Sequence, residues 1–166
     1  SLSNHDDAEV RGYMEELARS GRYEVSPAIK GRLEKLFAAG FCDDDQTQKV
    51  IGRMWQEHRY LIDPHTAVAF DVLDQYRRDT GDTTPTVGVS TASPFKFNDV
   101  VLASIDPDTY EGKKLDPFVA MEDLSKAAKL PIPASMQELP HLQKRQSDVV
   151  DKTQMEGEVK KLLGLE

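Results

Sequence analysis

The chain has 166 residues, close to the usual size of one domain, and its 29 acidic and 21 basic residues give a formal net charge of −8. That balance argues against nucleic acid and against an anionic membrane surface as partners, because both attract basic proteins. No apolar run approaches the roughly 18 residues of a membrane helix. The single cysteine, Cys42, excludes an internal disulfide and favours a reducing, cytoplasmic location.

Helical periodicity dominates the chain. Apolar residues recur at the i, i+3, i+4 and i+7 spacing of an amphipathic helix, and Asp or Ser directly before Pro repeatedly marks a capped helix start. Glycines that follow the stripes mark helix ends. The predicted helices run, in chain order, from Val10 to Gly21, from Ser26-Pro27 to Gly40, from Asp43 or Asp44 over Trp55, from Asp63-Pro64 to Gly81, from Pro94 over Val101, from Asp116-Pro117 over Ala128, and from about Ser147 over Leu163.

Strand signals are few. Residues 86–90 (Thr-Val-Gly-Val-Ser) lie between two prolines and predict one short buried strand. Residues 23–25 and 60–62 are possible strand fragments, and residues 130–142, with three prolines, predict an irregular connector. One strand cannot form a stable sheet. The chain is therefore either a helical domain with one extended segment or a piece of a larger α/β protein, and we favour the second interpretation.

Three hydroxyl side chains, those of Ser90, Thr91 and Ser93, follow this predicted strand and precede a predicted helix. Ligands of α/β proteins gather at the carboxyl ends of strands, and the first N–H groups of a helix favour an anion. The three residues are therefore candidates for ligand binding. The spacing alone favours a simpler role, in which Ser93 caps the helix and the other hydroxyls satisfy the turn.

A second candidate segment begins at Asp63-Pro64. His65 would lie in the first helical turn, as an acid–base group or a phosphate contact. The alternative, which spacing alone favours, has Asp63 as the helix cap and His65 on the surface. Neither the histidines nor the acidic run at residues 43–45 has the spacing of a metal site, so we expect no metal.

Two motifs carry a resemblance to a known family. Residues 91–97 (Thr-Ala-Ser-Pro-Phe-Lys-Phe) resemble the Thr-Ala-His-Pro-x-Lys-Phe segment of bacterial threonine synthases, which are pyridoxal-phosphate enzymes of the tryptophan-synthase-β-like fold. Residues 60–68 (Tyr-Leu-Ile-Asp-Pro-His-Thr-Ala-Val) resemble the segment that precedes it in the same family, and the order and separation of the motifs match. The resemblance covers at least residues 4–105. Ser93 stands where many members have histidine.

The resemblance implies that the intact enzyme has an α/β fold, that of a fold-type II pyridoxal-phosphate enzyme. This chain would be predominantly helical, with one or a few short strands. Residues 1–166 would be the C-terminal portion of the enzyme, with the family motifs in 1–105 and a helical extension in 106–166. The family's Schiff-base lysine and phosphate-binding loop lie upstream and are absent from this sequence. We therefore expect no catalytic residue here, and pyridoxal 5'-phosphate bound by the intact enzyme but absent from this chain alone.

The resemblance also implies site roles. Thr91 would approach the pyridine nitrogen of the cofactor, with Ser90 and Ser93 in support, and Lys96, His65 and Thr66 would lie near the substrate or its phosphate. Lys96 is not expected to form the Schiff base, because it falls in the first turn of a predicted helix and not in a desolvated setting.

The intact enzyme would convert O-phospho-L-homoserine and water to L-threonine and phosphate, with the remainder of the same enzyme and a small-molecule substrate as partners. The chain alone would be inactive. Two alternatives are a stand-alone helical interaction module and a fragment of another pyridoxal-phosphate lyase.

Overall fold

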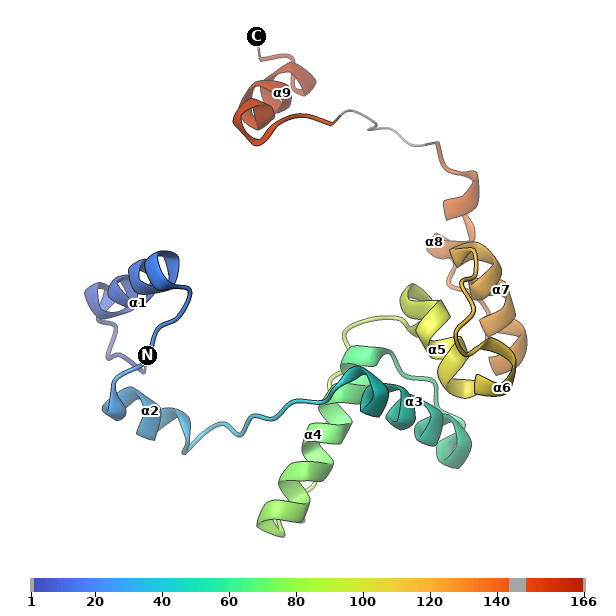
Figure 1. Cartoon of the computed structure of the whole chain (residues 1–166), viewed down its shortest axis with the longest axis horizontal. Coiled ribbons are helices and arrows are strands. Elements are labelled where there is room, and N and C mark those ends of the chain that lie inside the picture. The colour runs from blue at the N-terminus through green and yellow to red at the C-terminus, as the bar shows by residue number, and fades with distance from the viewer. Residues whose placement is uncertain (1, 144–148, 166) are drawn as a thin grey trace.

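The computed structural model describes residues 2–143 and 149–165, and within these ranges it contains α-helices and short 3-10 helices but no β-strand (Figure 1). The predominantly helical chain expected from the sequence is confirmed. The helices are α1 (Asp7–Ser20), α2 (Pro27–Leu33), α3 (Asp44–His58), α4 (Pro64–Thr80), α5 (Asn98–Ile105), α6 (Pro107–Tyr110), α7 (Pro117–Ala128), α8 (Ala134–Gln137) and α9 (Met155–Leu162), with 3-10 turns η1 (Pro94–Phe97), η2 (Leu139–His141) and η3 (Lys152–Gln154).

The predicted capping residues start the helices. The side chains of Ser26, Asp63 and Asp116 accept hydrogen bonds from backbone N–H groups of the first turns of α2, α4 and α7. Each is followed by proline, whose missing N–H costs nothing at the first helical position. Gly21 and Gly81 end α1 and α4 in the left-handed conformation, with φ of 75° and 70°. These boundaries follow the sequence closely.

Some boundaries differ from the prediction. α2 ends at Leu33 and not at Gly40, because Leu36 and Phe37 are exposed and have no core surface on which a longer helix could pack. α8 and η2 lie inside the expected irregular connector at 130–142. α6 was not predicted, although Asp106 caps it directly before a proline. The expected helix start near Ser147 lies outside the described residues.

The strand predicted at residues 86–90 was wrong, and so were the strand fragments predicted at 23–25 and 60–62. The structure shows no strand at any of these three places. Residues 60–62 instead lie in the link between α3 and α4, in which Leu61 and Ile62 are buried and Tyr60 is exposed. Residues 83–90 are exposed and form no ladder, because a ladder needs a second extended segment alongside.

The core lies among α3, α4, α5 and α7. α5 packs on both α3 and α7, and α3 also packs on α4. Gly52 permits the close approach of α3 to α5, since a Cβ at that position would lie 2.7 Å from the Ser104 carbonyl oxygen. The buried apolar cluster consists of Val50, Ile51, Leu61, Ile62, Ala67, Phe95, Val101, Leu102, Ala120, Met121, Leu124 and Ala128.

The extended segment 82–90 runs back along α4. Near the end of α4, Arg77 donates hydrogen bonds of 3.2 Å to the Thr84 carbonyl oxygen and to Thr86 Oγ1. Gly88 lies over the Phe70 ring, where an added Cβ would come within 3.0 Å. The 17-residue helix is about 25 Å long, a span that some nine extended residues cover. The chain therefore returns to the N-terminus of α4.

Successive residues of this segment face opposite ways. Thr86 and Gly88 contact α4, whereas Val87 and Val89 are 86% and 72% exposed. This is the two-residue alternation of an extended backbone. The outer face of the segment thus carries two valines without cover.

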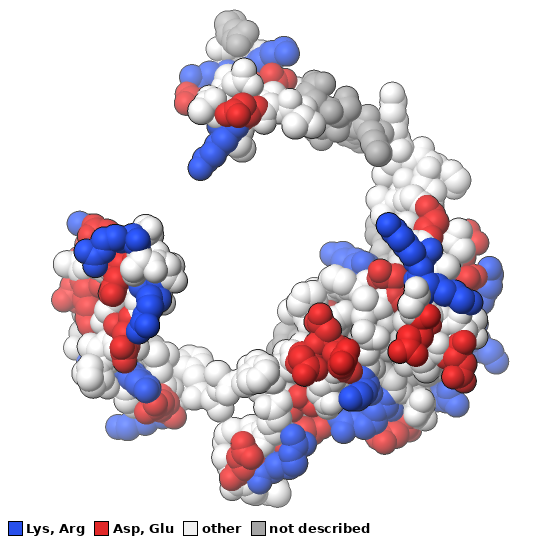
Figure 2. Space-filling model, in the orientation of Figure 1, with Lys and Arg blue, Asp and Glu red and all other residues white. Residues whose placement is uncertain are grey.

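The terminal helices α1 and α9 lie away from the core (Figure 1). Each has an exposed apolar stripe, formed by Val10, Met14 and Leu17 on α1 and by Met155, Val159 and Leu162 on α9, with Leu163 directly after it. Figure 2 shows acidic and basic side chains interspersed over the visible face of the chain. Among the described helices, none combines the length and apolar character that crossing a membrane would require.

Candidate functional site

The two sequence motifs meet at the N-terminus of α4. Ser90 Oγ lies 3.0 Å from Thr66 Oγ1, and the rings of His65 and Phe97 contact edge to face with centroids 5.0 Å apart. We call this region, residues 63–66 and 90–97, the motif junction. It forms because α4 and the returning segment have matching lengths. The network joins three of the six predicted site residues, His65, Thr66 and Ser90. The other three, Thr91, Ser93 and Lys96, lie in the adjoining segment 90–97.

A fully buried carboxylate lies at the centre of the junction. Asp63 accepts from the backbone N–H groups of His65 and Thr66, at 3.0 and 3.4 Å, and from the side chains of the same two residues. Burial raises the pKa of Asp63. The hydrogen bonds from Thr66 and His65 together lower it by a larger amount, so the pKa lies below its ordinary value. Asp63 is consequently ionised and accepts hydrogen bonds without donating any.

His65 lies on the outer side of this carboxylate. Its Nδ1 atom is 2.9 Å from Asp63 Oδ2, while 65% of its side chain is exposed. The Phe97 ring contacts it from η1. The ring is thus fixed on one side and open to solvent on the other. This arrangement agrees with both sequence interpretations, the surface histidine and the acid–base group.

The three hydroxyl residues after the extended segment occupy different settings. Ser90 is exposed but contacts Thr66, which is buried. Thr91 is exposed, and its hydroxyl makes no hydrogen bond within the described residues. Ser93 Oγ accepts from the Phe95 N–H at 3.3 Å and so caps η1. A capping role for Ser93 was the simpler of the two interpretations of its position.

Lys96 is exposed on η1 and forms no ion pair with an acidic residue in the described part of the chain. Lys96 is thus a solvated lysine in this structure. An exposed ammonium stays well hydrated, which is the opposite of the desolvated setting that activates a Schiff-base lysine.

A second buried carboxylate was missed by the sequence analysis. Asp71, in the middle of α4, is 5% exposed and accepts hydrogen bonds from Gln46 at 2.9 Å and Gln75 at 2.6 Å. The hydrogen bond from Gln46 lowers the pKa of Asp71 more than burial raises it. The only available signal was its spacing, four residues after buried Ala67 and four before Gln75.

Cys42 lies next to this cluster, with its Sγ atom 3.3 Å from Thr47 Oγ1. Burial raises the pKa of the Cys42 thiol, and the carboxylates of Asp71 and Asp43 raise it further. The thiol is therefore held in its protonated, weakly nucleophilic form.

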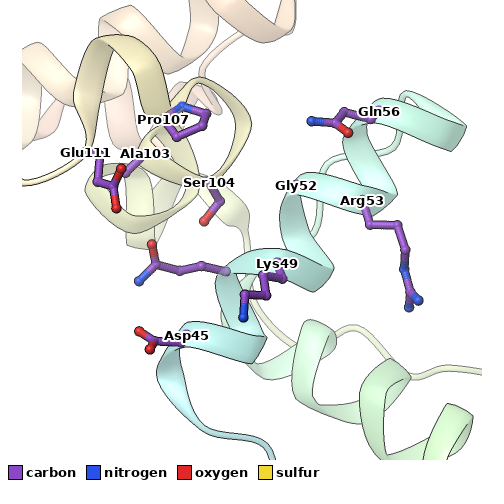
Figure 3. Close-up of a pocket in the computed structure, with 10 residues that line it drawn as sticks. Asp45, Lys49, Gly52, Arg53, Gln56, Ala103, Ser104, Pro107 and Glu111 are labelled. Carbon is purple, nitrogen blue, oxygen red and sulfur yellow. The ribbon is translucent and has the colours of Figure 1, made fainter.

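A pocket of about 530 Å³ lies between α3 and the α5–α6 region (Figure 3). Its wall combines both charges, with Asp45 and Lys49 on α3 and Glu111 just after α6. Arg53, also on this wall, is engaged by Asp74 at 2.7 Å. None of the predicted site residues lines it. The pocket and the motif junction are therefore separate features.

Comparison with known proteins decides the family. The family model described as threonine synthase, C-terminal, matches residues 66–162, which is more than half of the chain. The chain belongs to this family. The match to the threonine synthase family includes most of the motif junction and continues past residue 105, where the sequence motifs end. The division into residues 1–105 and 106–166 itself stays a prediction.

Individual relatives agree with the threonine synthase family. The chain is 29% identical over 109 residues to threonine synthase-like 2 of Homo sapiens, covering 65% of this chain and 22% of the relative. It is 31% identical over 103 residues to threonine synthase of Schizosaccharomyces pombe, covering 59% of this chain and 20% of that protein. The chain thus spans about a fifth of the length of these curated relatives.

A solved structure extends the agreement to the fold. The structure of pyridoxal-phosphate-bound threonine synthase from Brucella melitensis matches with a TM-score of 0.55 and 26% identity, over 77% of this chain and 30% of that one. The resemblance to the C-terminal part of threonine synthase is confirmed. So is the fold class, a predominantly helical portion of a fold-type II pyridoxal-phosphate enzyme.

Proposed function

We propose that this chain is the C-terminal part of a threonine synthase, a pyridoxal-phosphate-dependent carbon–oxygen lyase that converts O-phospho-L-homoserine and water to L-threonine and phosphate. The observation that carries the proposal is the motif junction, where both family motifs meet and the Thr91 hydroxyl is exposed without a partner in the described residues. Pyridoxal phosphate, when bound, supplies an electron sink, while the protein supplies orientation and electrostatics.

Thr91 is the residue of this chain that we assign to the cofactor. Its hydroxyl is free to contact the pyridine nitrogen, and a neutral hydroxyl does not hold a proton on that nitrogen as a carboxylate would. Ser90 supports this position through its contact with Thr66, and Ser93 supports it by starting η1. These contacts fix the backbone on both sides of Thr91.

The substrate and its phosphate would lie beside the same face. His65 and Lys96 are exposed there and can reach a ligand, whereas buried Thr66 acts through its neighbours. Nothing in the described residues resembles the desolvated lysine of a Schiff base, so that lysine would come from the upstream part of the enzyme. The isolated chain should therefore have no threonine synthase activity.

The partner that we propose is the remainder of the same enzyme. Val87 and Val89 face outward from an extended segment whose backbone has no ladder in the described residues, which suits pairing with a strand of another segment. The apolar stripes of α1 and α9 would be covered in the same way. The intact enzyme would be cytoplasmic, and we expect neither nucleic acid nor a membrane as a partner.

The decisive experiment uses the full-length protein, with the upstream part in place. Thr91→Val should weaken cofactor binding, measured by absorbance titration with pyridoxal phosphate, or lower the turnover of O-phosphohomoserine. Thr91→Ser, which keeps the hydroxyl, is the matched control and should retain both. Unchanged affinity and kinetics in Thr91→Val would remove this residue from the site.

The alternatives give different results in the same experiment. Another pyridoxal-phosphate lyase would bind the cofactor through Thr91 but would not release phosphate from O-phosphohomoserine. A stand-alone interaction module would bind no cofactor.

Two further tests use the isolated chain. Borohydride reduction with pyridoxal phosphate, followed by peptide mapping, should find no selective labelling of Lys96 above other surface lysines. Release of phosphate from O-phosphohomoserine above a buffer control would contradict the proposed inactivity.

A further inference from the structure

One buried carboxylate determines which nitrogen of His65 carries the ring proton at the motif junction. We propose that Asp63 is a positioning residue that holds the proton of a neutral His65 on Nδ1 and so leaves Nε2 as a hydrogen-bond acceptor on the outer face of the junction. In its neutral form His65 would then receive a donor from the ligand, such as an ammonium or amide N–H group, and not a phosphate oxygen. The inference deepens the proposed function, because it assigns a hydrogen-bonding role to one residue of the face that we place beside the ligand, where Lys96 can contact a phosphate.

The argument for His65 starts from the protonation of its partner. Asp63 is ionised and has no proton to donate, so the 2.9 Å contact between Asp63 Oδ2 and His65 Nδ1 requires the proton on Nδ1. In a neutral imidazole the other nitrogen, Nε2, then carries the lone pair. Since most of the side chain is exposed, this lone pair is available outside the junction.

The lone pair on Nε2 decides what a neutral His65 can bind. A phosphate oxygen is itself an acceptor and finds no donor in this form of the ring. An ammonium or amide N–H group would satisfy the acceptor. Asp63 sets this polarity without touching the ligand, which is why it is a positioning residue.

The test reads the tautomer of His65 directly in the full 166-residue chain. Two-bond ¹⁵N–¹H correlation spectra are recorded at a pH at which the imidazole rings are neutral. We expect the Nδ1–H tautomer in the unaltered chain, and a shift of population towards Nε2–H in Asp63→Asn. Asp71→Asn, which alters an equally buried carboxylate of α4 away from the junction, should leave the tautomer unchanged. An Nε2–H tautomer in the unaltered chain would overturn the proposal whether or not any variant folds.

A second readout uses inorganic phosphate as the probe. Phosphate should not displace the neutral His65 signals, and a saturable displacement would refute the acceptor role of His65. Neither readout needs the cofactor, so this inference and the proposed function fail separately.

Discussion

The core helix α3 and the terminal helix α1 have similar amphipathic patterns but different surroundings. Both are mainly polar with one apolar stripe, yet Ile51 in α3 is fully buried while Leu17 in α1 is 41% exposed. Capping and periodicity therefore determine where a helix forms, and the presence of a packing partner determines whether its apolar face is buried. The difference can be tested by substitutions in each region.

The largest difference is expected for matched leucine truncations. Leu102→Ala removes a fully buried side chain of α5, the helix that packs on α3 and α7, and should lower the free energy of unfolding by about 2–5 kcal/mol. Leu162→Ala, in α9, removes a side chain that is 65% exposed and should change it by no more than about 0.5 kcal/mol. Urea unfolding followed by circular dichroism measures both. Equal effects would show that α9 is packed in solution.

Acid should weaken the motif junction more than the terminal helices. The pKa of Asp63 is lowered on folding, so its contribution to stability is complete above the ordinary carboxyl pKa of about 4 and is lost as pH falls through the lower folded pKa. Asp63→Asn removes that ionisation. Its unfolding free energy should be lower at neutral pH, by about 1–3 kcal/mol, and should decrease less on acidification. Parallel pH profiles for the variant and the unaltered chain would contradict this assignment.

Substitution of one glycine in the core and one in a terminal helix tests the comparison at the backbone. In Gly52→Ala the new Cβ would lie 2.7 Å from the Ser104 carbonyl, so α3 and α5 must separate, and the strain of about 1–3 kcal/mol should exceed the gain in helix propensity. Gly12→Ala in α1 meets nothing within 4 Å and should stabilise its helix by up to about 1 kcal/mol. Thermal unfolding measures whether each substitution lowers or raises the stability. A stabilising Gly52→Ala would mean that the interhelical contact is looser than described.

The smallest effect is expected for exposed ion pairs. Arg11 and Asp7 in α1 are 2.8 Å apart but largely solvent-exposed. Arg11→Ala should therefore lower the helicity of α1 only slightly, corresponding to about 0.3–0.5 kcal/mol, and less in high salt. Circular dichroism at low and high salt measures this. The comparison within the core is Arg53→Ala, because Arg53 in α3 pairs with Asp74 in α4. A larger loss of stability in Arg11→Ala than in Arg53→Ala would contradict the expected order of effects.

Local sequence signals predicted the helices well, whereas the pairing of distant segments was not predicted correctly. Asp63-Pro64 and Gly81 gave both ends of α4, because caps and left-handed ends depend on only a few neighbouring residues. The strand at 86–90 was wrong, since a ladder depends on a partner segment that β-branched residues cannot reveal.

The candidate site shows the same division. The motifs around His65 and Thr91 were identified from their sequence, but their contact through Thr66 and Ser90 depends on the length of α4 and of the segment that returns along it. Asp71 was missed because a polar residue on a buried helix face is recognisable only once its partners on α3 are known. The roles of the six predicted site residues toward the cofactor and substrate stay predictions.

The alternation of residues 84–90 along α4 has a consequence for how this region can evolve. Substitution of Val87 or Val89 changes only the outer face, whereas inserting or deleting one residue before Ser90 would exchange the two faces and place a valine against Thr66. The helix cannot compensate, because one added residue rotates its surface by about 100°. Related chains should therefore vary here in residue identity while keeping the number of residues between Gly81 and Ser90 constant.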